Sequence, residues 1–252
     1  MTSRETTGFL PRNHAAESRP VWRRGVRDWA WLLGVGAVQW PWLLKSLDGG
    51  LPENKAKLLA RLGLPADALP NLGSWKADTG LLALLADEIE EHRPLEVVEL
   101  GAGASTLILA RALQLWGGGQ LTSFDQHGEF VEATSEWLGA HGLSADLRAA
   151  PLGPAPGNWP GLWYQAPRLP ERIDLLVIDG PPWTIHPLTR GAASSLFDRI
   201  APGGAVILDD AARPGERIVA RRWRREWPGF DWRLVHTGAK GTLVGRRGSA
   251  PA

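Results

Sequence analysis

From about residue 75 onward, apolar residues follow two alternating patterns. Short runs with the pattern of strands stand at 97–100, 121–124, 173–178 and 205–208, with a weaker run at 145–149. The run at 173–178 is the strongest and is typical of a strand buried on both faces. Between these runs the apolar positions recur at helical spacing. They predict a helix that begins at Asp78-Thr79 and ends before Pro94, and further helices over 105–115, 129–141, 188–200 and 213–227. Two last runs, 232–235 and 242–245, flank a glycine-containing loop and predict a hairpin.

This alternation of strands and helices determines the fold class. Strands separated by helices form a parallel sheet with helices on both of its faces. The sequence therefore predicts an α/β protein with a doubly wound, mostly parallel sheet, to which the terminal hairpin adds an antiparallel pair at one edge.

The first 74 residues have a different pattern of polar and apolar positions. Residues 1–20 are polar and predict a disordered tail. Residues 21–74 are helical in pattern but interrupted by Pro41, Pro52, Pro65 and Pro70, so we expect an N-terminal cap of several short helices. The remaining domain spans residues 75–247.

The most apolar part of this cap runs from Trp29 to Leu44. At 16 residues it is shorter than the ~20 that a helix needs to cross a membrane. We expect a buried helix whose tryptophans line a pocket. Contact with a membrane surface, favoured by the arginines just before the segment, is the weaker alternative, and the segment also offers a surface for a homo-oligomer.

Composition and charge narrow the classes of function. The net charge is +1, which gives no basic excess for binding nucleic acid. The absence of cysteine excludes thiolate metal ligands and cysteine nucleophiles. The polar N-terminus lacks the apolar core of a secretory signal, so we expect a cytoplasmic location.

Residues able to bind a ligand follow the first two predicted strands. The first strand ends in Glu99-Leu100 and continues as Gly101-Ala102-Gly103-Ala104-Ser105-Thr106, and the second ends in Asp125. Glycines let the backbone turn tightly and approach a ligand, and the two hydroxyls can cap the next helix. An acid after the second strand is placed to bind ribose hydroxyls.

The spacing separates this loop from other nucleotide-binding motifs. Thr106 stands where a dinucleotide fingerprint needs its third glycine, and no P-loop occurs. The segments VVELGAGAST, SFDQ, IDLLVIDGPP and APGGAVILDDAARPGE instead resemble, in this order, the class I S-adenosylmethionine-dependent methyltransferases. The pairing of IDGPP with ILDDA and a terminal KGTLV resembles a bacterial subgroup of small-molecule O-methyltransferases. The resemblance covers about residues 75–247.

The resemblance implies a Rossmann-like methyltransferase fold with seven strands, the last antiparallel. It also implies a cofactor site for S-adenosylmethionine formed by Glu99, Gly101, Ala102, Gly103, Ser105, Thr106, Asp125, Pro151, Leu152 and Asp179, with Pro151 and Leu152 beside the adenine. The implied activity is O-methylation of a small hydroxylated acceptor. Methylation of RNA or protein and a non-catalytic cofactor-binding role are the alternatives, and the charge balance disfavours a nucleic-acid partner.

Three acids close the fourth and fifth predicted strands: Asp179, Asp209 and Asp210. Adjacent parallel strands bring their ends together, and oxygen ligands suit Mg²⁺. This arrangement resembles the catechol-type O-methyltransferases, in which such acids bind the metal. The alternative is that Asp179 contacts the acceptor without a metal and that the other two acids cap the next helix.

The base for the reaction is less clear from the sequence. The position of the catechol-type catalytic lysine is Pro182 here, and none of the five lysines lies near it in sequence. His186 is the nearest candidate base, the alternative being a histidine in a surface loop. Arg190 and Arg213 are expected to form ion pairs or to bind the acceptor.

A long loop at 151–170 contains Trp159, Trp163 and Tyr164 among many Pro and Gly residues. These aromatic residues are expected either to form a wall of the acceptor pocket or to fix the loop by packing.

Overall fold

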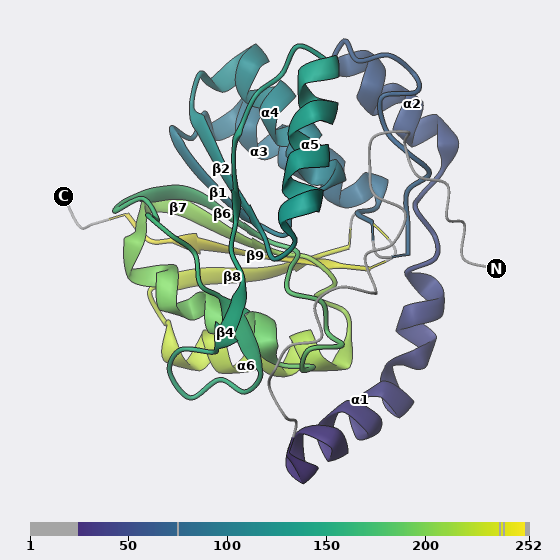
Figure 1. Cartoon of the computed structure of the whole chain (residues 1–252). Coiled ribbons are helices and arrows are strands. Elements are labelled where there is room, and N and C mark those ends of the chain that lie inside the picture. Colours follow the sequence, from purple (N-terminus) through teal and green to yellow (C-terminus); the bar gives the residue numbers. More distant parts are fainter. Residues whose placement is uncertain (1–24, 75, 237, 239, 250–252) are drawn as a thin grey trace.

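The computed structural model describes residues 25–249 except 75, 237 and 239. The predicted disordered tail at 1–20 therefore lies outside the described residues. Figure 1 shows a central sheet with helices on both faces and the helix α1 at the periphery.

The central sheet has seven strands in the order β3-β2-β1-β6-β7-β9-β8. They are β1 (Glu96–Leu100), β2 (Gln120–Asp125), β3 (Asp146–Ala149), β6 (Ile173–Ile178), β7 (Ile200–Leu208), β8 (Phe230–Val235) and β9 (Thr242–Arg247). The first five are mutually parallel, and β9 pairs antiparallel with both β7 and β8. The predicted α/β class and seven-stranded sheet are confirmed.

Alternate residues of each buried strand enter two separate cores. On one face, Val97 and Leu175 pack with α3 (Thr79–His92), α4 (Ala104–Ala112) and α5 (Gly128–Ala140). On the other, Val98 and Leu176 pack with the 3₁₀ helix η2 (Thr189–Arg199) and α6 (Pro214–Glu226). This division explains why the central strands are mostly apolar, because both of their faces are covered.

Several predicted elements differ in detail. The segment predicted as an α-helix at 188–200 is the 3₁₀ helix η2, and the strand predicted at 205–208 begins earlier, at Ile200. A short π-helix, η1 (Leu113–Gly117), continues α4. The loop at 151–170 contains an antiparallel pair, β4 (Leu152–Pro154) and β5 (Leu162–Tyr164), whose three-residue strands are too short to produce a readable alternation.

The N-terminal cap contains α1 (Val26–Lys45) and α2 (Pro52–Arg61). The prediction that Pro41 breaks the first helix is wrong: α1 continues through it, since a proline removes only one intrahelical hydrogen-bond donor. The expected buried helix is also wrong, because Trp29, Trp31 and Trp40 are 47%, 43% and 59% exposed. Only one face of α1 meets the domain, and its outward face remains apolar and exposed.

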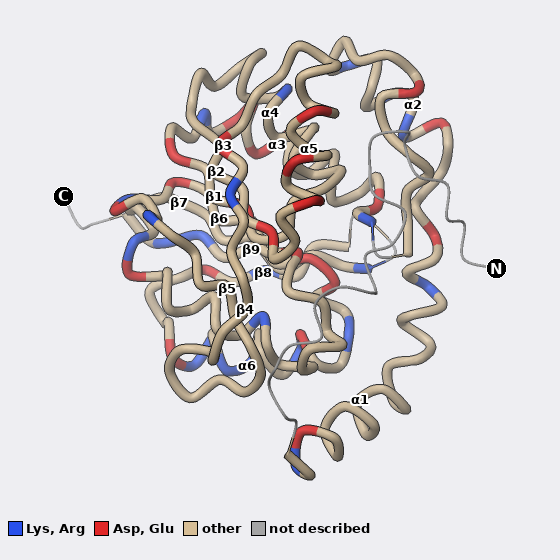
Figure 2. Tube along the Cα trace, viewed as in Figure 1, with Lys and Arg blue, Asp and Glu red and all other residues tan. Residues whose placement is uncertain are grey.

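No helix among the described residues is long and apolar enough to cross a membrane. Figure 2 shows Lys and Arg interspersed with Asp and Glu over most of the trace, in keeping with the near-zero net charge.

Candidate functional site

The predicted site residues lie at the carboxyl ends of β1, β2, β6 and β7, which meet at one edge of the sheet. The backbone joins these ends directly. The carbonyl of Leu100 accepts hydrogen bonds from the amides of Asp179, at 2.9 Å, and Gly180, at 2.7 Å. The amide of Gly101 in turn donates to Phe124 at 2.8 Å. The glycine loop and the acid after β6 therefore share one rigid support.

Glu99 is fully buried at the end of β1. Its Oε2 accepts hydrogen bonds from Thr106 Oγ1 at 2.6 Å and Ser123 Oγ at 2.5 Å. Its Oε1 is buried without a hydrogen-bond partner among the described residues. Burial raises the pKa of Glu99 to about 7. Glu99 is thus oriented through one oxygen and presents the other for a ligand.

The two hydroxyl residues after the glycine loop are both buried. Thr106 Oγ1 accepts from the amide of Gly103 at 2.8 Å while it donates to Glu99, so Thr106 connects the loop to the acid. The structure places Ser105 and Thr106 at the start of α4, as predicted, with Thr106 directed at Glu99.

The two glycines of the loop have different surroundings. Gly101 has a φ of +103°, and a Cβ there would lie 2.7 Å from the amide nitrogen of Gly180. A Cβ on Gly103 would meet no atom within 4 Å. A glycine is therefore required at position 101 by the fold. At Gly103, the neighbour of Ala102, the space that a side chain would occupy is open.

Asp125 ends β2 on the other side of the loop. Its Oδ1 accepts a hydrogen bond from the amide of His127 at 2.9 Å, and its burial raises its pKa to about 7. The amide of Ala150 donates to the Asp125 carbonyl at 2.7 Å, which brings Pro151 and Leu152 to this end of the sheet. The predicted ribose and adenine positions are thus neighbours.

Asp179, Asp209 and Asp210 converge as their positions predict, since one carboxylate oxygen of each lies within 4.8 Å of the others. Asp209 and Asp210 are almost completely buried, whereas the Asp179 side chain is 17% exposed. Burial raises the pKa of Asp179, although Arg190 opposes it. Asp179 is therefore the acid of this cluster that can meet an acceptor.

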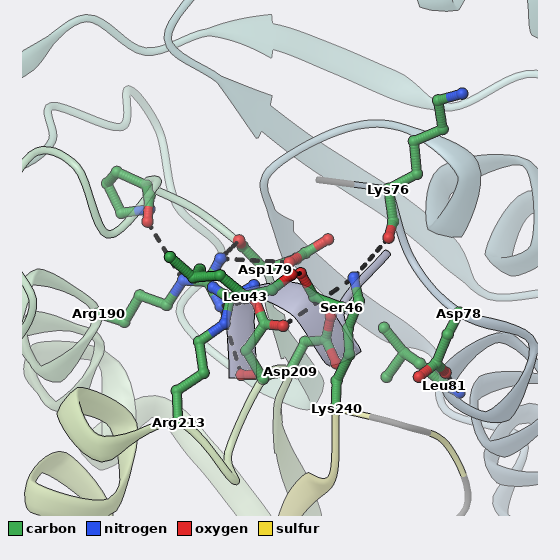
Figure 3. Close-up of polar contacts among 12 residues, drawn as sticks. Leu43, Ser46, Lys76, Asp78, Leu81, Asp179, Arg190, Asp209, Arg213 and Lys240 are labelled. Atoms are coloured by element: carbon green, nitrogen blue, oxygen red, sulfur yellow. Dashed lines mark hydrogen bonds and ion pairs between the residues drawn. The ribbon is translucent and has the colours of Figure 1, made fainter. Parts of the chain in front are cut away.

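Three cations lie among these acids (Figure 3). Arg190 contacts Asp179 Oδ1 at 3.3 Å and Asp210 Oδ2 at 3.1 Å. Arg213 contacts Asp210 Oδ2 at 2.8 Å, and Lys240 Nζ lies 4.0 Å from Asp210 Oδ1. The predicted ion pairs of Arg190 and Arg213 are confirmed. With two of its three acids already paired to cations, the cluster is a poor fit for Mg²⁺.

His186 is buried in the loop after β6 rather than on the surface. The amide of Leu188 donates to its Nδ1 at 3.1 Å, so a neutral ring carries its proton on Nε2. In this arrangement His186 is a hydrogen-bond donor and is poorly placed to act as a base.

Helix α1 passes over the same loop. The rings of Trp31 and His186 lie 6.2 Å apart, and a Cβ on Gly36 would contact the Trp183 ring at 3.8 Å. Gln39, one turn further along the inward face, is fully buried, and neither polar atom of its side chain has a hydrogen-bond partner among the described residues. At the end of α1, the hydroxyl of Ser46, the residue that follows the helix, donates to the carbonyl of Leu43 at 2.7 Å (Figure 3).

The aromatic residues of the 151–170 loop pack inside the protein. Trp159, Trp163 and Tyr164 are all buried and belong to the core beneath η2 and α6. Tyr164 also reaches the site, because a Cβ on Gly180 would clash with its hydroxyl.

Sequence reasoning missed Lys240 and Glu216. Lys240 comes just before β9, which pairs with β7 so that Leu243 lies opposite Leu208. Recognising the terminal strand as the partner of β7 would have brought Lys240 to the acids. Glu216 on α6 is buried near Arg190 and Arg213, and burial raises its pKa to about 7.

Comparison with known proteins agrees with this geometry. Residues 98–211 match a family model described as a methyltransferase domain. No curated protein matches the sequence.

Solved structures share the fold at low sequence identity. The O-methyltransferase from Bacillus cereus in complex with SAH has a TM-score of 0.54 and 15% identity, covering 84% of this chain and 97% of its own. SAH-bound PaMTH1, a methyltransferase from Podospora anserina, has a TM-score of 0.53 and 14% identity, covering 90% and 99%. With its sheet order, this chain therefore shares the fold of these methyltransferases, and residues 98–211 are similar to the methyltransferase domain family.

Proposed function

We propose that this protein binds S-adenosylmethionine and transfers its methyl group to an oxygen of a small hydroxylated acceptor. The observation that carries the proposal is Glu99, whose buried Oε1 has no hydrogen-bond partner among the described residues and whose Oε2 is joined through Thr106 to Gly103 of the glycine loop. A buried carboxylate oxygen without a partner is costly unless a ligand satisfies it.

The cofactor supplies a sulfonium-bound methyl group when it is bound. We assign Glu99 to its ammonium group and the backbone of Gly101, Ala102 and Gly103 to its methionine end. Asp125 is assigned to the ribose hydroxyls, with Pro151 and Leu152 beside the adenine. Ser105 and Thr106 support the loop, and Thr106 orients Glu99 through its hydroxyl.

The acceptor is assigned to the surroundings of Asp179 and of the loop after β6, which α1 contacts through Trp31 and Gly36. Asp179 is partly exposed and fixed to the end of β1 through Leu100, so it is placed to receive the proton of the acceptor hydroxyl. The side-chain amide of Gln39, which has no hydrogen-bond partner among the described residues, is assigned to a polar group of the acceptor. In this assignment residues 75–247 form the catalytic domain and α1 covers the acceptor.

The experiment has two stages. Isothermal titration with S-adenosylmethionine tests the cofactor site, comparing the wild type with Glu99→Gln and with Asp198→Asn, a change at an exposed acid far from the loop. Turnover is then measured as S-adenosylhomocysteine released with a panel of small phenols, sugars and hydroxy acids. Binding lost in Glu99→Gln alone, with turnover on an acceptor of this panel, supports the proposal; absence of binding in the wild type refutes it.

A further inference from the structure

A cluster of six charged side chains occupies the carboxyl ends of β6 and β7. It consists of Asp179, Asp209, Asp210, Arg190, Arg213 and Lys240, and we refer to it as the counter-ion cluster. The Arg190, Arg213 and Lys240 side chains are 6%, 7% and 2% exposed. Cations this deeply buried require compensating negative charge, so these contacts differ from ordinary surface ion pairs.

Arg190 occupies the central position of this cluster. Its guanidinium bridges the carboxylates of Asp179 and Asp210. Its other donors are held by backbone carbonyls, with Nε 3.2 Å from Pro181 O and Nη1 3.3 Å from Asp209 O. Because both strand ends hold it through main-chain atoms, this guanidinium is fixed where a cation shared by the two acids would lie.

Asp210 is the acid most strongly committed to protein cations. Its backbone has a φ of +59°, and the turn it makes is closed by hydrogen bonds from Ala211 to Gly241 and from Ala212 to Lys240. This turn brings Lys240 next to the acids, where Nζ also donates to the carbonyl of Lys76 at 2.5 Å. Burial opposes ionisation of Asp210, yet Arg213, Lys240 and Arg190 outweigh it and lower the pKa of Asp210.

The charges of the cluster are compensated almost completely without any further ion. Its three acids face three cations, and Glu216, buried near Arg190 and Arg213, is one further acid, so a divalent ion would add two positive charges where at most one is lacking. Both carboxylate oxygens of Asp209 and the Oδ1 of Asp210 have no hydrogen-bond partner among the described residues, but Lys240 Nζ lies 4.0 Å from that Oδ1. A divalent ion bound by these oxygens would therefore have to share Asp210 with Arg190, Arg213 and Lys240.

We infer that Arg190, Arg213 and Lys240 are built-in counter-ions that take the place of a divalent cation among Asp179, Asp209 and Asp210, so that the site works without a metal. Arg190 is then a positioning residue that holds Asp179 at the acceptor. The role of these counter-ions follows from charge and geometry alone, and only the turnover measurement below rests on the proposed function.

The test is a titration of the full-length protein with Mn²⁺, followed by electron paramagnetic resonance of the free ion. The wild type is compared with Arg190→Met and Lys240→Met, each of which removes one buried positive charge. Arg217→Met, at an exposed position of α6, is the matched control. Circular dichroism and thermal melts select the variants that fold.

We expect no saturable binding in the wild type or in Arg217→Met up to millimolar Mn²⁺, and saturable binding gained in at least one folded charge-removing variant. Wild-type binding that Mg²⁺ displaces and Asp209→Asn abolishes overturns the inference. Absence of any gain in both folded variants also overturns it, because the cations would then not be excluding a metal.

Turnover gives a second measurement. On an acceptor found by the panel, the rate is expected to be the same with EDTA and with added Mg²⁺, and loss of activity in EDTA that Mg²⁺ restores overturns the inference. If no acceptor is turned over, the proposed function fails while the Mn²⁺ titration still decides the charge argument, so the two failures are distinguishable.

Discussion

Cofactor affinity is expected to fall as the pH is lowered through 7. Burial raises the pKa of both Glu99 and Asp125 to about 7, and the nearby charge of Asp179 adds to this. The cofactor carries an ammonium group and ribose hydroxyl donors, which require ionised carboxylates as partners. A carboxyl with a raised pKa is ionised above that pKa and protonated below it, so binding is strong above pH 7 and weakens below it.

The size of the effect follows from the two pKa values. From pH 7 to pH 6, the cost of ionising one group with a pKa of about 7 weakens binding about fivefold, and two independent groups weaken it about 30-fold. Glu99→Gln leaves only Asp125 to titrate, so its affinity is lower throughout but changes only about fivefold over the same interval.

Isothermal titration at pH 7.5, 7.0, 6.5 and 6.0 measures this dependence directly. Repeating each titration in two buffers of different ionisation enthalpy counts the protons released on binding, which are expected to approach two at the lowest pH. An affinity that is constant from pH 7.5 to 6.0, or protons taken up on binding, would show that these two carboxyls do not meet the cofactor as anions.

Three further predictions test other parts of the site. Gly103→Ala is expected to keep the melting temperature of the wild type and to lose cofactor affinity, as measured by thermal melts and by titration. Gly101→Ala is expected instead to lose about 1–3 kcal/mol of stability in thermal melts, because of backbone strain and the clash of its Cβ with Gly180. Asp125→Asn is expected to weaken cofactor binding about ten- to a hundredfold by titration, and unchanged affinity would remove this acid from the ribose. Gln39→Met is expected to raise stability by about 1 kcal/mol, since it removes a buried amide without partners, and to raise the KM for the acceptor; a lower stability with unchanged KM would contradict its assignment.

The sequence predicted those parts of the fold that depend on local pattern. The central strands of the parallel sheet are mostly apolar on both faces, so each could be recognised from its own residues. The strand ends then followed from topology, which brought Glu99, Asp125, Asp179 and Asp209 to one edge. Contacts that depend on tertiary packing could not be predicted from the sequence. Apolar composition cannot say which face of α1 is covered, and its tryptophans proved to be exposed.

The cations of the acid cluster illustrate the same limit. Lys240 lies about 60 residues after Asp179 in the sequence, and it reaches the acids only because β9 returns antiparallel beside β7. Arg190 and Arg213 were near the acids in sequence, but spacing alone did not distinguish an ion pair from an acceptor contact. In the sequence, where their partners cannot be seen, the three acids resemble a metal site. Only the distances to Arg190, Arg213 and Lys240 in the structure show that protein cations balance the negative charge of these acids.

The backbone contacts between the glycine loop and the acid cluster connect the cofactor side of the site to the acceptor side. The carbonyl of Leu100 holds the amides of both Asp179 and Gly180, and Gly101 packs against Gly180 so closely that a Cβ cannot be inserted. Arg190 then fixes the Asp179 side chain from the far side. A displacement of the loop by a fraction of an ångström must therefore move Asp179 as well. Methyl transfer depends mainly on the distance and alignment of the two reacting groups. We therefore expect Gly180→Ala, whose Cβ must displace the Tyr164 hydroxyl and press on Gly101, to lower the turnover rate more than it lowers the cofactor affinity measured by titration; an equal loss of both would contradict this connection.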